Sequence, residues 1–270
     1  MKTSLLLLGL LVATTAHGQI QIVDTAPGSN QVALSGTYTQ NFDSLTGTGS
    51  LKFWTDNSTL PGWYITDSAY GFGFGGGEGI WSLGYAGGQG DRALGPVGSI
   101  SHDELIAVSF KNLTSSTLTS LSVTFDGEQW NRQAANPQKP SSLLFSYQVF
   151  DAGTGAIYIV ENTGWTFVPT LGFTSPNASL NASSTLDGND PANSVRGFVS
   201  FVNGFTLAPG QELWLSWGSY SALGVPIHGL GIDNLSVSFA TVPEPSTYAA
   251  LLGGLVLGFV ALRRRRTACG

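Results

Sequence analysis

Residues that could do chemistry lie close together at one point of the chain. Carboxylates at Asp126 and Glu128 precede the indole of Trp130, and the guanidinium of Arg132 follows. Because side chains alternate along a strand, we expect Asp126, Glu128 and Trp130 to share one face, opposite Val123. An indole stacks on the C–H face of a sugar ring, while carboxylates accept hydrogen bonds from its hydroxyl groups. These four residues therefore predict a carbohydrate-binding face.

Two other interpretations of this segment remain open. In the first, Trp130 packs on the edge of the core and Glu128 pairs with an arginine such as Arg92 or Arg132, since tryptophan is often buried. In the second, Asp126 and Glu128 are a glycosidase pair, which needs two carboxylates roughly 5 to 9.5 Å apart. Because residues 19–241 contain sixteen acidic residues, such a spacing is common and does not by itself predict an enzyme.

Asp233 is a second candidate site. It is in register with Leu235, Val237 and Phe239, so its carboxylate is expected to point toward the inner side of the last strand. A buried carboxylate needs a partner. One candidate is a structural Ca²⁺ ion, which binds oxygen ligands and could be shared with Asp43. The other is a set of backbone N–H groups or an internal arginine.

Other chemistries find little support in the sequence. His102 and His228 are the only histidines between residues 19 and 241, and the single cysteine is Cys269, so a zinc site or a cysteine nucleophile is not expected there. The chain has no Gly-x-Ser-x-Gly elbow. Residues 187–190 resemble the start of a calcium loop but lack its later glutamate, which predicts a polar turn. We predict a non-enzymatic protein with no cofactor other than the candidate Ca²⁺.

The middle of the chain alternates apolar and polar residues with a period of two. This pattern is typical of strands that bury one face, and it occurs in six segments: Ile106–Val108–Phe110, Leu121–Val123–Phe125, Leu143–Phe145–Tyr147–Val149, Val199–Phe201, Leu213–Leu215–Trp217 and Leu235–Val237–Phe239. Turn-forming clusters separate the segments, and no helical periodicity is visible. The sequence predicts an all-β fold, an antiparallel β-sandwich with jelly-roll topology. The glycine-rich residues 70–90 are expected to be an irregular loop.

Charge and composition narrow the possible partners. The chain has 270 residues with 36 Gly and only 10% charged residues. Residues 19–242 contain six basic and sixteen acidic residues, a net charge of −10. Nucleic-acid binding needs clustered Lys and Arg, so we expect no nucleic-acid partner. An acidic surface of this kind is compatible with binding divalent cations or neutral glycans.

The first eighteen residues have the three regions of a signal peptide. Lys2 provides the basic start, residues 4–13 the apolar region, and Ala16 and Gly18 the small residues before a cleavage site. We therefore predict that residues 1–18 are removed by signal peptidase after passage through the Sec translocon. The β ectodomain then begins at Gln19 and extends to residue 241.

Residues 242–270 combine three features in order. A Pro243-Glu244-Pro245 triplet is followed by an uncharged apolar segment, 248–262, and by a basic cluster of four residues, Arg263, Arg264, Arg265 and Arg266. As a helix, the apolar segment is about 22 Å long, shorter than the ~30 Å hydrocarbon core, which suits a temporary transmembrane anchor. The arginines are expected to hold the C-terminus in the cytoplasm and so to leave the ectodomain outside.

This tail resembles the PEP-CTERM sorting signal. The resemblance implies recognition by an exosortase near the Pro-Glu-Pro triplet, in a Gram-negative bacterium that makes exopolysaccharide. The segments 91–95, 126–130 and 231–237 are similar to segments of many exported PEP-CTERM proteins, whose ectodomains look like carbohydrate-binding or lectin-type jelly rolls.

Together these features predict an exported protein that is first anchored in the inner membrane and then placed on the cell surface or in the biofilm matrix. Its ectodomain is a candidate for non-catalytic binding of exopolysaccharide. A secreted glycan hydrolase and a purely structural envelope protein are the alternatives. Burial of all six of the following residues would favour the structural protein: Trp63, Trp81, Trp130, Trp165, Trp214 and Trp217.

Overall fold

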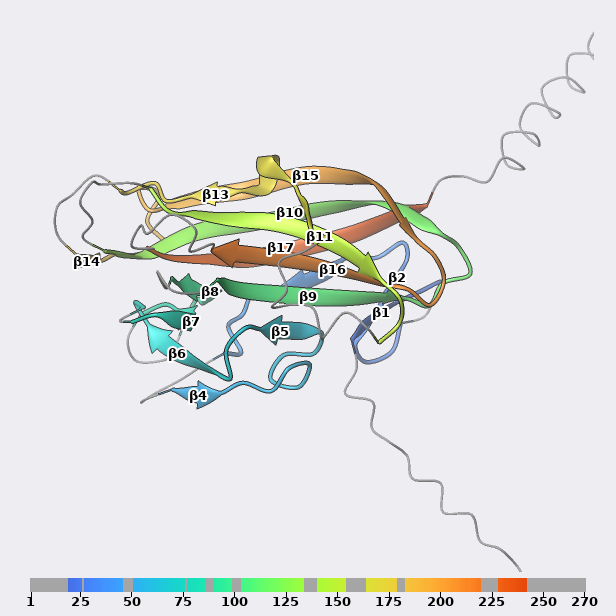
Figure 1. The fold of residues 1–270 in the computed structure, drawn as a ribbon, viewed down its shortest axis with the longest axis horizontal. Coiled ribbons are helices and arrows are strands. Elements are labelled where there is room, and N and C mark those ends of the chain that lie inside the picture. The colour runs from blue at the N-terminus through green and yellow to red at the C-terminus, as the bar shows by residue number, and fades with distance from the viewer. Residues whose placement is uncertain are drawn as a thin grey trace, which may run out of the picture.

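The structure is a computed structural model, and Figure 1 shows its fold. It describes residues 19–25, 27–45, 51–75, 77–85, 90–98, 103–133, 140–153, 164–178, 183–219 and 228–241. The predicted signal peptide, transmembrane segment and arginine cluster lie outside these residues. No helix in the described ranges is long and apolar enough to cross a membrane.

Two sheets form the molecule. The first sheet has eight strands, with the order β12-β11-β16-β9-β1-β2 and with β13 and β5 at its sides. Its strands are β1 (Ile20–Val23), β2 (Gln31–Ala33), β5 (Trp63–Ile65), β9 (Glu104–Asn112), β11 (Ser142–Phe150), β12 (Thr166–Phe167), β13 (Phe173–Thr174) and β16 (Glu212–Ser219).

The second sheet has nine strands, with the order β14-β10-β17-β8-β7-β6-β4 and with β15 and β3 at its sides. Its strands are β3 (Tyr38–Gln40), β4 (Lys52–Phe53), β6 (Ala69–Gly73), β7 (Gly79–Leu83), β8 (Ala93–Val97), β10 (Leu118–Arg132), β14 (Ser184–Thr185), β15 (Ser194–Leu207) and β17 (Gly229–Thr241). A short 3₁₀ helix, η2 (Pro169–Leu171), lies between β12 and β13.

The longest strands change sheet at every step along the chain. β9, β11 and β16 belong to the first sheet, whereas β10, β15 and β17 belong to the second. Neighbouring long strands within each sheet are antiparallel. This alternation confirms the predicted jelly-roll sandwich, although three pairs of shorter strands are parallel: β1 with β2, β1 with β9, and β6 with β7.

Apolar side chains from the two inner faces form one continuous core. It includes the predicted inward residues of five segments, among them Val108, Phe125, Phe145, Leu215 and Val237. These apolar residues alternate with polar residues along each strand. Each strand can therefore bury one face in the core and turn the other face outward.

Two local expectations were wrong. Val199 and Phe201 of β15 were expected to point inward, but they are 60% and 74% exposed. Phe198 instead stacks on Phe125 in the core, so the strand has the opposite phase. The glycine-rich segment 70–90 is not wholly irregular, because it includes most of β6 and all of β7, which pair in parallel. These strands lie with β4 and β8 beside one end of the long strands (Figure 1).

Candidate functional site

Strand β10 brings two of the predicted site residues into contact. Trp130 Nε1 donates a hydrogen bond of 2.8 Å to Glu128 Oε2, so both side chains project from the same face of β10. This face is opposite the main core, as the alternation predicted. Trp130 packs there against a second, smaller cluster of buried apolar residues, Leu83, Ala93 and Val97.

Trp130 is fully buried and offers no ring face to a sugar. Tyr85 lies edge-on to its ring at 5.7 Å. On another side, Gly188 approaches the indole so closely that a Cβ atom there would overlap it. The geometry therefore favours a structural role for Trp130, packed inside the fold, over a role as a platform on which a sugar ring stacks. The segment that contains Gly188 is a polar turn, as its sequence predicted, with Asn189 N donating to Asp187 Oδ1.

Arg196 on β15 joins the two carboxylates of the predicted pair. Its Nη1 atom lies 3.2 Å from Asp126 Oδ2 and 2.7 Å from Glu128 Oε1. Glu128 is fully buried, and burial is the main cause that raises its pKa to about 7, with the hydrogen bond from Trp130 and the charge of Arg196 acting in the opposite direction. The partner of Glu128 is therefore neither Arg92 nor Arg132, the arginines expected from the sequence. Arg196 was missed because the pairing of β15 with β10 is long-range.

Replacing Arg196 with alanine should destabilise the fold. The change leaves Glu128, which is buried, without its cation and places it beside Asp126, so we expect a loss of about 1–3 kcal/mol at pH 8. Urea denaturation of the purified protein measures this loss. As a control, Arg196→Ala combined with Glu128→Gln should recover part of it, because the buried charge is then gone. A full loss in the double variant would contradict the ion pair as the cause.

Arg132 makes a hydrogen bond to a residue outside this group. Its Nη1 atom donates to Asn177 Oδ1 at 3.0 Å, and the side chain is almost fully buried. It also lowers the pKa of His228, an effect second to that of burial. The four residues predicted to form one carbohydrate-binding face are thus divided. Asp126, Glu128 and Trp130 belong to one network that includes Arg196, whereas Arg132 contacts Asn177.

The carboxylate of Asp233 points to the opposite face from the one predicted. Thr124 pairs with Ser236, but Asp126 pairs with Asp233, so β17 has one extra residue at this position. The extra residue is a bulge at Asn234, whose φ of +50° is left-handed. Leu230 and Ile232 point into the core. Asp233 therefore lies on the face of Glu128, not in phase with Leu235.

Asp233 meets two other carboxylates there. Asp91, Glu128 and Asp233 each place one oxygen within 4.8 Å of the others. Asp233 is 0% exposed, and neither of its carboxylate oxygens has a hydrogen-bond partner. Burial, together with the charges of nearby carboxylates, raises its pKa to about 8. The N–H of Asn234 offsets part of this rise, although it does not reach hydrogen-bonding geometry.

Asp43, the other predicted calcium ligand, is outside this three-carboxylate group. Its Oδ1 atom accepts from the backbone N–H of Arg92 at 3.0 Å, and its Oδ2 atom accepts from Asn41 Nδ2 at 2.7 Å. Asp43 remains close enough for its charge to act on Asp233. The sequence analysis did not single out Asp91 as a ligand. It did note the three segments 91–95, 126–130 and 231–237, and one member of each segment contributes to the group.

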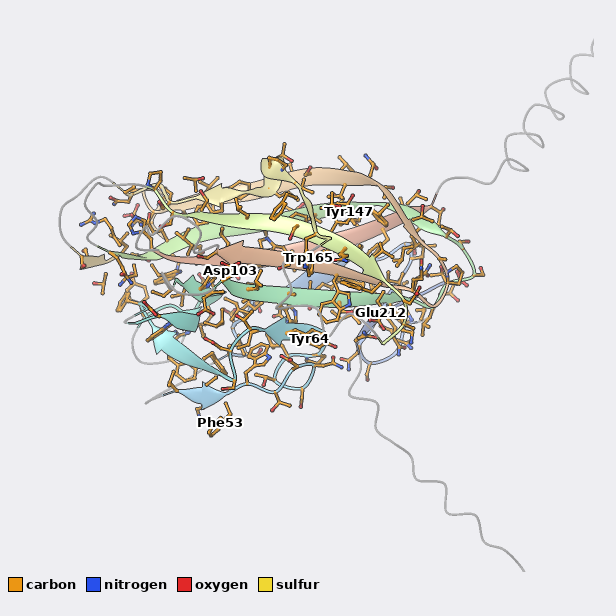
Figure 2. All side chains as sticks on the ribbon, in the orientation of Figure 1. Phe53, Tyr64, Asp103, Tyr147, Trp165 and Glu212 are labelled. Atoms are coloured by element: carbon orange, nitrogen blue, oxygen red, sulfur yellow. The ribbon has the colours of Figure 1, made fainter. Side chains whose placement is uncertain are left out.

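A second group of interest lies on the outer face of the first sheet. Tyr64 of β5 and Trp214 of β16 have ring centroids 4.4 Å apart, and Phe150 of β11 lies 6.2 Å from Trp214. Trp165 packs against Phe150 at 6.3 Å and is the partly exposed member of this aromatic group. Glu212 accepts from Trp214 Nε1 at 3.3 Å. Figure 2 labels Tyr64, Trp165 and Glu212 over the strands of this sheet.

Unpaired polar oxygens accompany these aromatic side chains. Ser216 pairs with Ala107 on one side and with Ser146 on the other, while Trp214 pairs in the same way with Ser109 and Gln148. Four buried side-chain oxygens in these two rows have no hydrogen-bond partner: Ser109 Oγ, Ser146 Oγ, Ser216 Oγ and Gln148 Oε1. Such groups are rare unless water or a ligand satisfies them. This face is not visible in the sequence because its residues come from five separate segments.

The C-terminal tail can be compared directly with known sorting signals. Residues 241–266 match the PEP-CTERM protein-sorting motif. The chain carries a PEP-CTERM signal. This signal indicates an exported protein that is anchored in the membrane and then processed by an exosortase.

The PEP-CTERM chain as a whole resembles solved structures at low sequence identity. No curated protein sequence matches it. The CBM22-1–CBM22-2 tandem domain of Paenibacillus barcinonensis Xyn10C is 13% identical with a TM-score of 0.34, and the match covers 69% of this chain and 44% of that one. The mannan-recognising module TmCBM27 is 13% identical with a TM-score of 0.33, covering 72% and 97%. A CBM28 module specific for non-crystalline cellulose is 13% identical with a TM-score of 0.32, covering 72% and 96%.

Proposed function

We propose that this protein is a non-catalytic component of the cell surface or extracellular matrix of a Gram-negative bacterium. After export through the Sec translocon and processing by signal peptidase and an exosortase, its sandwich binds exopolysaccharide through the outer face of the first sheet. The PEP-CTERM signal supports export and processing. The observation that carries the binding function is the combination of packed aromatic rings and unpaired oxygens on that face.

The residue types on this face suit a sugar chain. Trp165 offers an indole that is partly open to solvent, and indoles stack on the apolar faces of sugar rings. The hydroxyl groups of Ser109, Ser146 and Ser216 can both donate and accept hydrogen bonds, and because these side chains are fully buried, a sugar would reach them through bridging water. Buried Tyr64 keeps its proton because burial, Glu212 and Asp56 together raise its pKa to about 12, so its hydroxyl remains a donor at physiological pH.

The geometry favours binding over hydrolysis. Glu128 is the member of the predicted glycosidase pair with the raised pKa, but it is fully buried, and each of its oxygens already accepts one hydrogen bond, from Trp130 or from Arg196. A general acid must reach the glycosidic oxygen. The pair therefore supports the fold rather than a reaction. Four of the six tryptophans named above are fully buried, whereas Trp81 and Trp165 are half-buried, so a purely structural protein is not favoured by that criterion.

Trp165→Ala should weaken polysaccharide binding by at least tenfold, equal to about 1.4 kcal/mol, because the variant loses the accessible stacking ring. The measurement is retention of the full-length chain, purified in mild detergent, on exopolysaccharide from a producing strain and on a glycan array. Circular dichroism should show an unchanged fold.

Phe201→Ala is the matched control. Phe201 is 74% exposed but belongs to β15 of the second sheet, so its loss should leave retention unchanged. If Phe201→Ala abolishes retention and Trp165→Ala does not, the second sheet is the binding surface and the proposed face is wrong. Absence of retention on every glycan would instead favour a structural envelope protein.

A further inference from the structure

Three neighbouring strands of the second sheet converge on one group of carboxylates. Asp91 precedes β8 by two residues, Glu128 belongs to β10, and Asp233 belongs to β17. In the sheet, β17 lies between β10 and β8. In the chain, Asp233 is more than one hundred residues from both Asp91 and Glu128, so the group depends on long-range strand pairing.

The spacing of the oxygens matches a single bound ion. One oxygen from each residue lies within 4.8 Å of the other two. Calcium binds oxygen at about 2.3–2.6 Å, so two oxygens on one ion can be no more than about 4.6–5.2 Å apart. The three carboxylates thus need little movement to share one ion.

An independent observation concerns Asp233. Its side chain is fully buried, and neither carboxylate oxygen has a hydrogen-bond partner. Leaving a carboxylate buried without a partner is costly, and proteins normally pair such groups or use them to coordinate metals. An oxygen of Asp233 lies within 4.8 Å of oxygens of Asp91 and Glu128. The unpaired carboxylate is therefore directed into the group formed by these three residues.

The neighbouring charges that raise the pKa of Asp233 are all negative. They are those of Glu128, Asp91 and Asp43. The cation Arg196 contacts Glu128 Oε1 and Asp126 on the β15 side of the group. A positive charge at the centre of the three carboxylates would relieve this repulsion.

We propose that Asp91, Glu128 and Asp233 bind one divalent metal ion, and that this ion is calcium. All three ligands are carboxylates, which suit a hard cation and give no preference for zinc or copper. Asp91 is exposed, so water can complete the coordination from its side and the ion can enter there. The ion ties β8, β10 and β17 together. This inference does not depend on glycan binding.

Terbium provides a direct test, because Tb³⁺ occupies calcium sites and emits when a nearby indole is excited. The full-length protein, freed of metal with a chelator, should show Tb³⁺ emission that saturates at one ion per chain and is displaced by Ca²⁺ more readily than by Mg²⁺. Trp130 is hydrogen-bonded to the ligand Glu128, so Trp130→Phe should reduce the emission at least threefold while calorimetry still detects calcium. Displacement by Mg²⁺ alone would overturn the assignment to calcium.

Ligand variants complete the test. Asp91→Asn and Asp233→Asn should each weaken calcium binding at least tenfold in calorimetry, with circular dichroism showing an intact fold. Asp24→Asn is the control, because Asp24 is exposed and accepts a hydrogen bond from Ser115 N away from this group. Calcium affinity that is unchanged in both ligand variants, or no calcium binding by the native chain, would overturn the proposal.

Discussion

With calcium removed, Asp233→Asn should make the protein more stable at pH 8, by about 2–3 kcal/mol. The pKa of Asp233 rises from 3.8 to about 8 in the folded protein, which at about 1.4 kcal/mol per unit sets an upper limit near 6 kcal/mol. Its coupling to Glu128 keeps the expected gain below this limit. For a domain of this size the gain corresponds to a rise in Tm of about 4–12 °C, measured by calorimetry.

The sign of the pH dependence follows from linkage. The folded pKa lies above the unfolded one, so between pH 4 and 8 the folded state holds a proton that the unfolded state has lost. The contribution of Asp233 to the stability of the calcium-free native protein should therefore be greatest below pH 4 and fall as the pH rises to about 8. Asp233→Asn should flatten this decline. With calcium the native protein gains stability from an ion that the variant binds at least tenfold more weakly, so the advantage of the variant should shrink. A variant that is less stable than native protein at pH 8 with chelator would contradict the prediction.

Trp217→Ala should cause the largest loss of stability, about 3–5 kcal/mol, because it removes a fully buried indole from the centre of the sandwich. Trp217 contacts Trp63 at 6.1 Å, Phe125 at 5.7 Å and Phe145 at 5.1 Å between ring centroids, so the cavity would touch both sheets. Urea denaturation provides the measurement, with an unchanged m-value expected if the variant still unfolds in two states.

Trp217→Phe is a matched comparison. Trp217 Nε1 has no hydrogen-bond partner, so the smaller aromatic ring loses volume but no polar contact. We expect it to cost about half as much as alanine or less. A second control, Phe201→Ala, should change stability by less than about 0.5 kcal/mol, because this ring is largely exposed. Equal losses in all three variants would show that ring packing around Trp217 is not the cause.

A cation in the second sheet would also explain how an exported domain is held together without disulfides. Cys269 is the only cysteine of the chain, and it lies outside the predicted ectodomain. Exported domains often use covalent cross-links. One ion shared by three strands stabilises the fold because it binds the folded state and not the unfolded chain, provided that calcium is present outside the cell.

The strands and their inward residues were largely readable from the sequence. Alternation placed Val108, Phe125 and Val237 in the core because a strand of a two-layer fold must bury one face. The same argument gave the wrong phase for β15. Its inward residues are Phe198 and Val202, and the exposed Val199 and Phe201 have the same apolar character. Apolar residues on both faces of an edge strand leave its phase undetermined by pattern alone.

For the candidate sites, too, some features follow from the sequence and others only from the tertiary structure. Residue types and spacing alone determined that Glu128 and Trp130 share a face, that the chain carries a sorting signal, and that carboxylates outnumber cations. Only the tertiary structure decided that Asp233 faces Glu128 and Asp91, because one extra residue at Asn234 reverses the direction of every side chain before it in β17. The partners Arg196 and Asp91 come from distant strands, and strand pairing over such distances depends on how the whole sandwich packs.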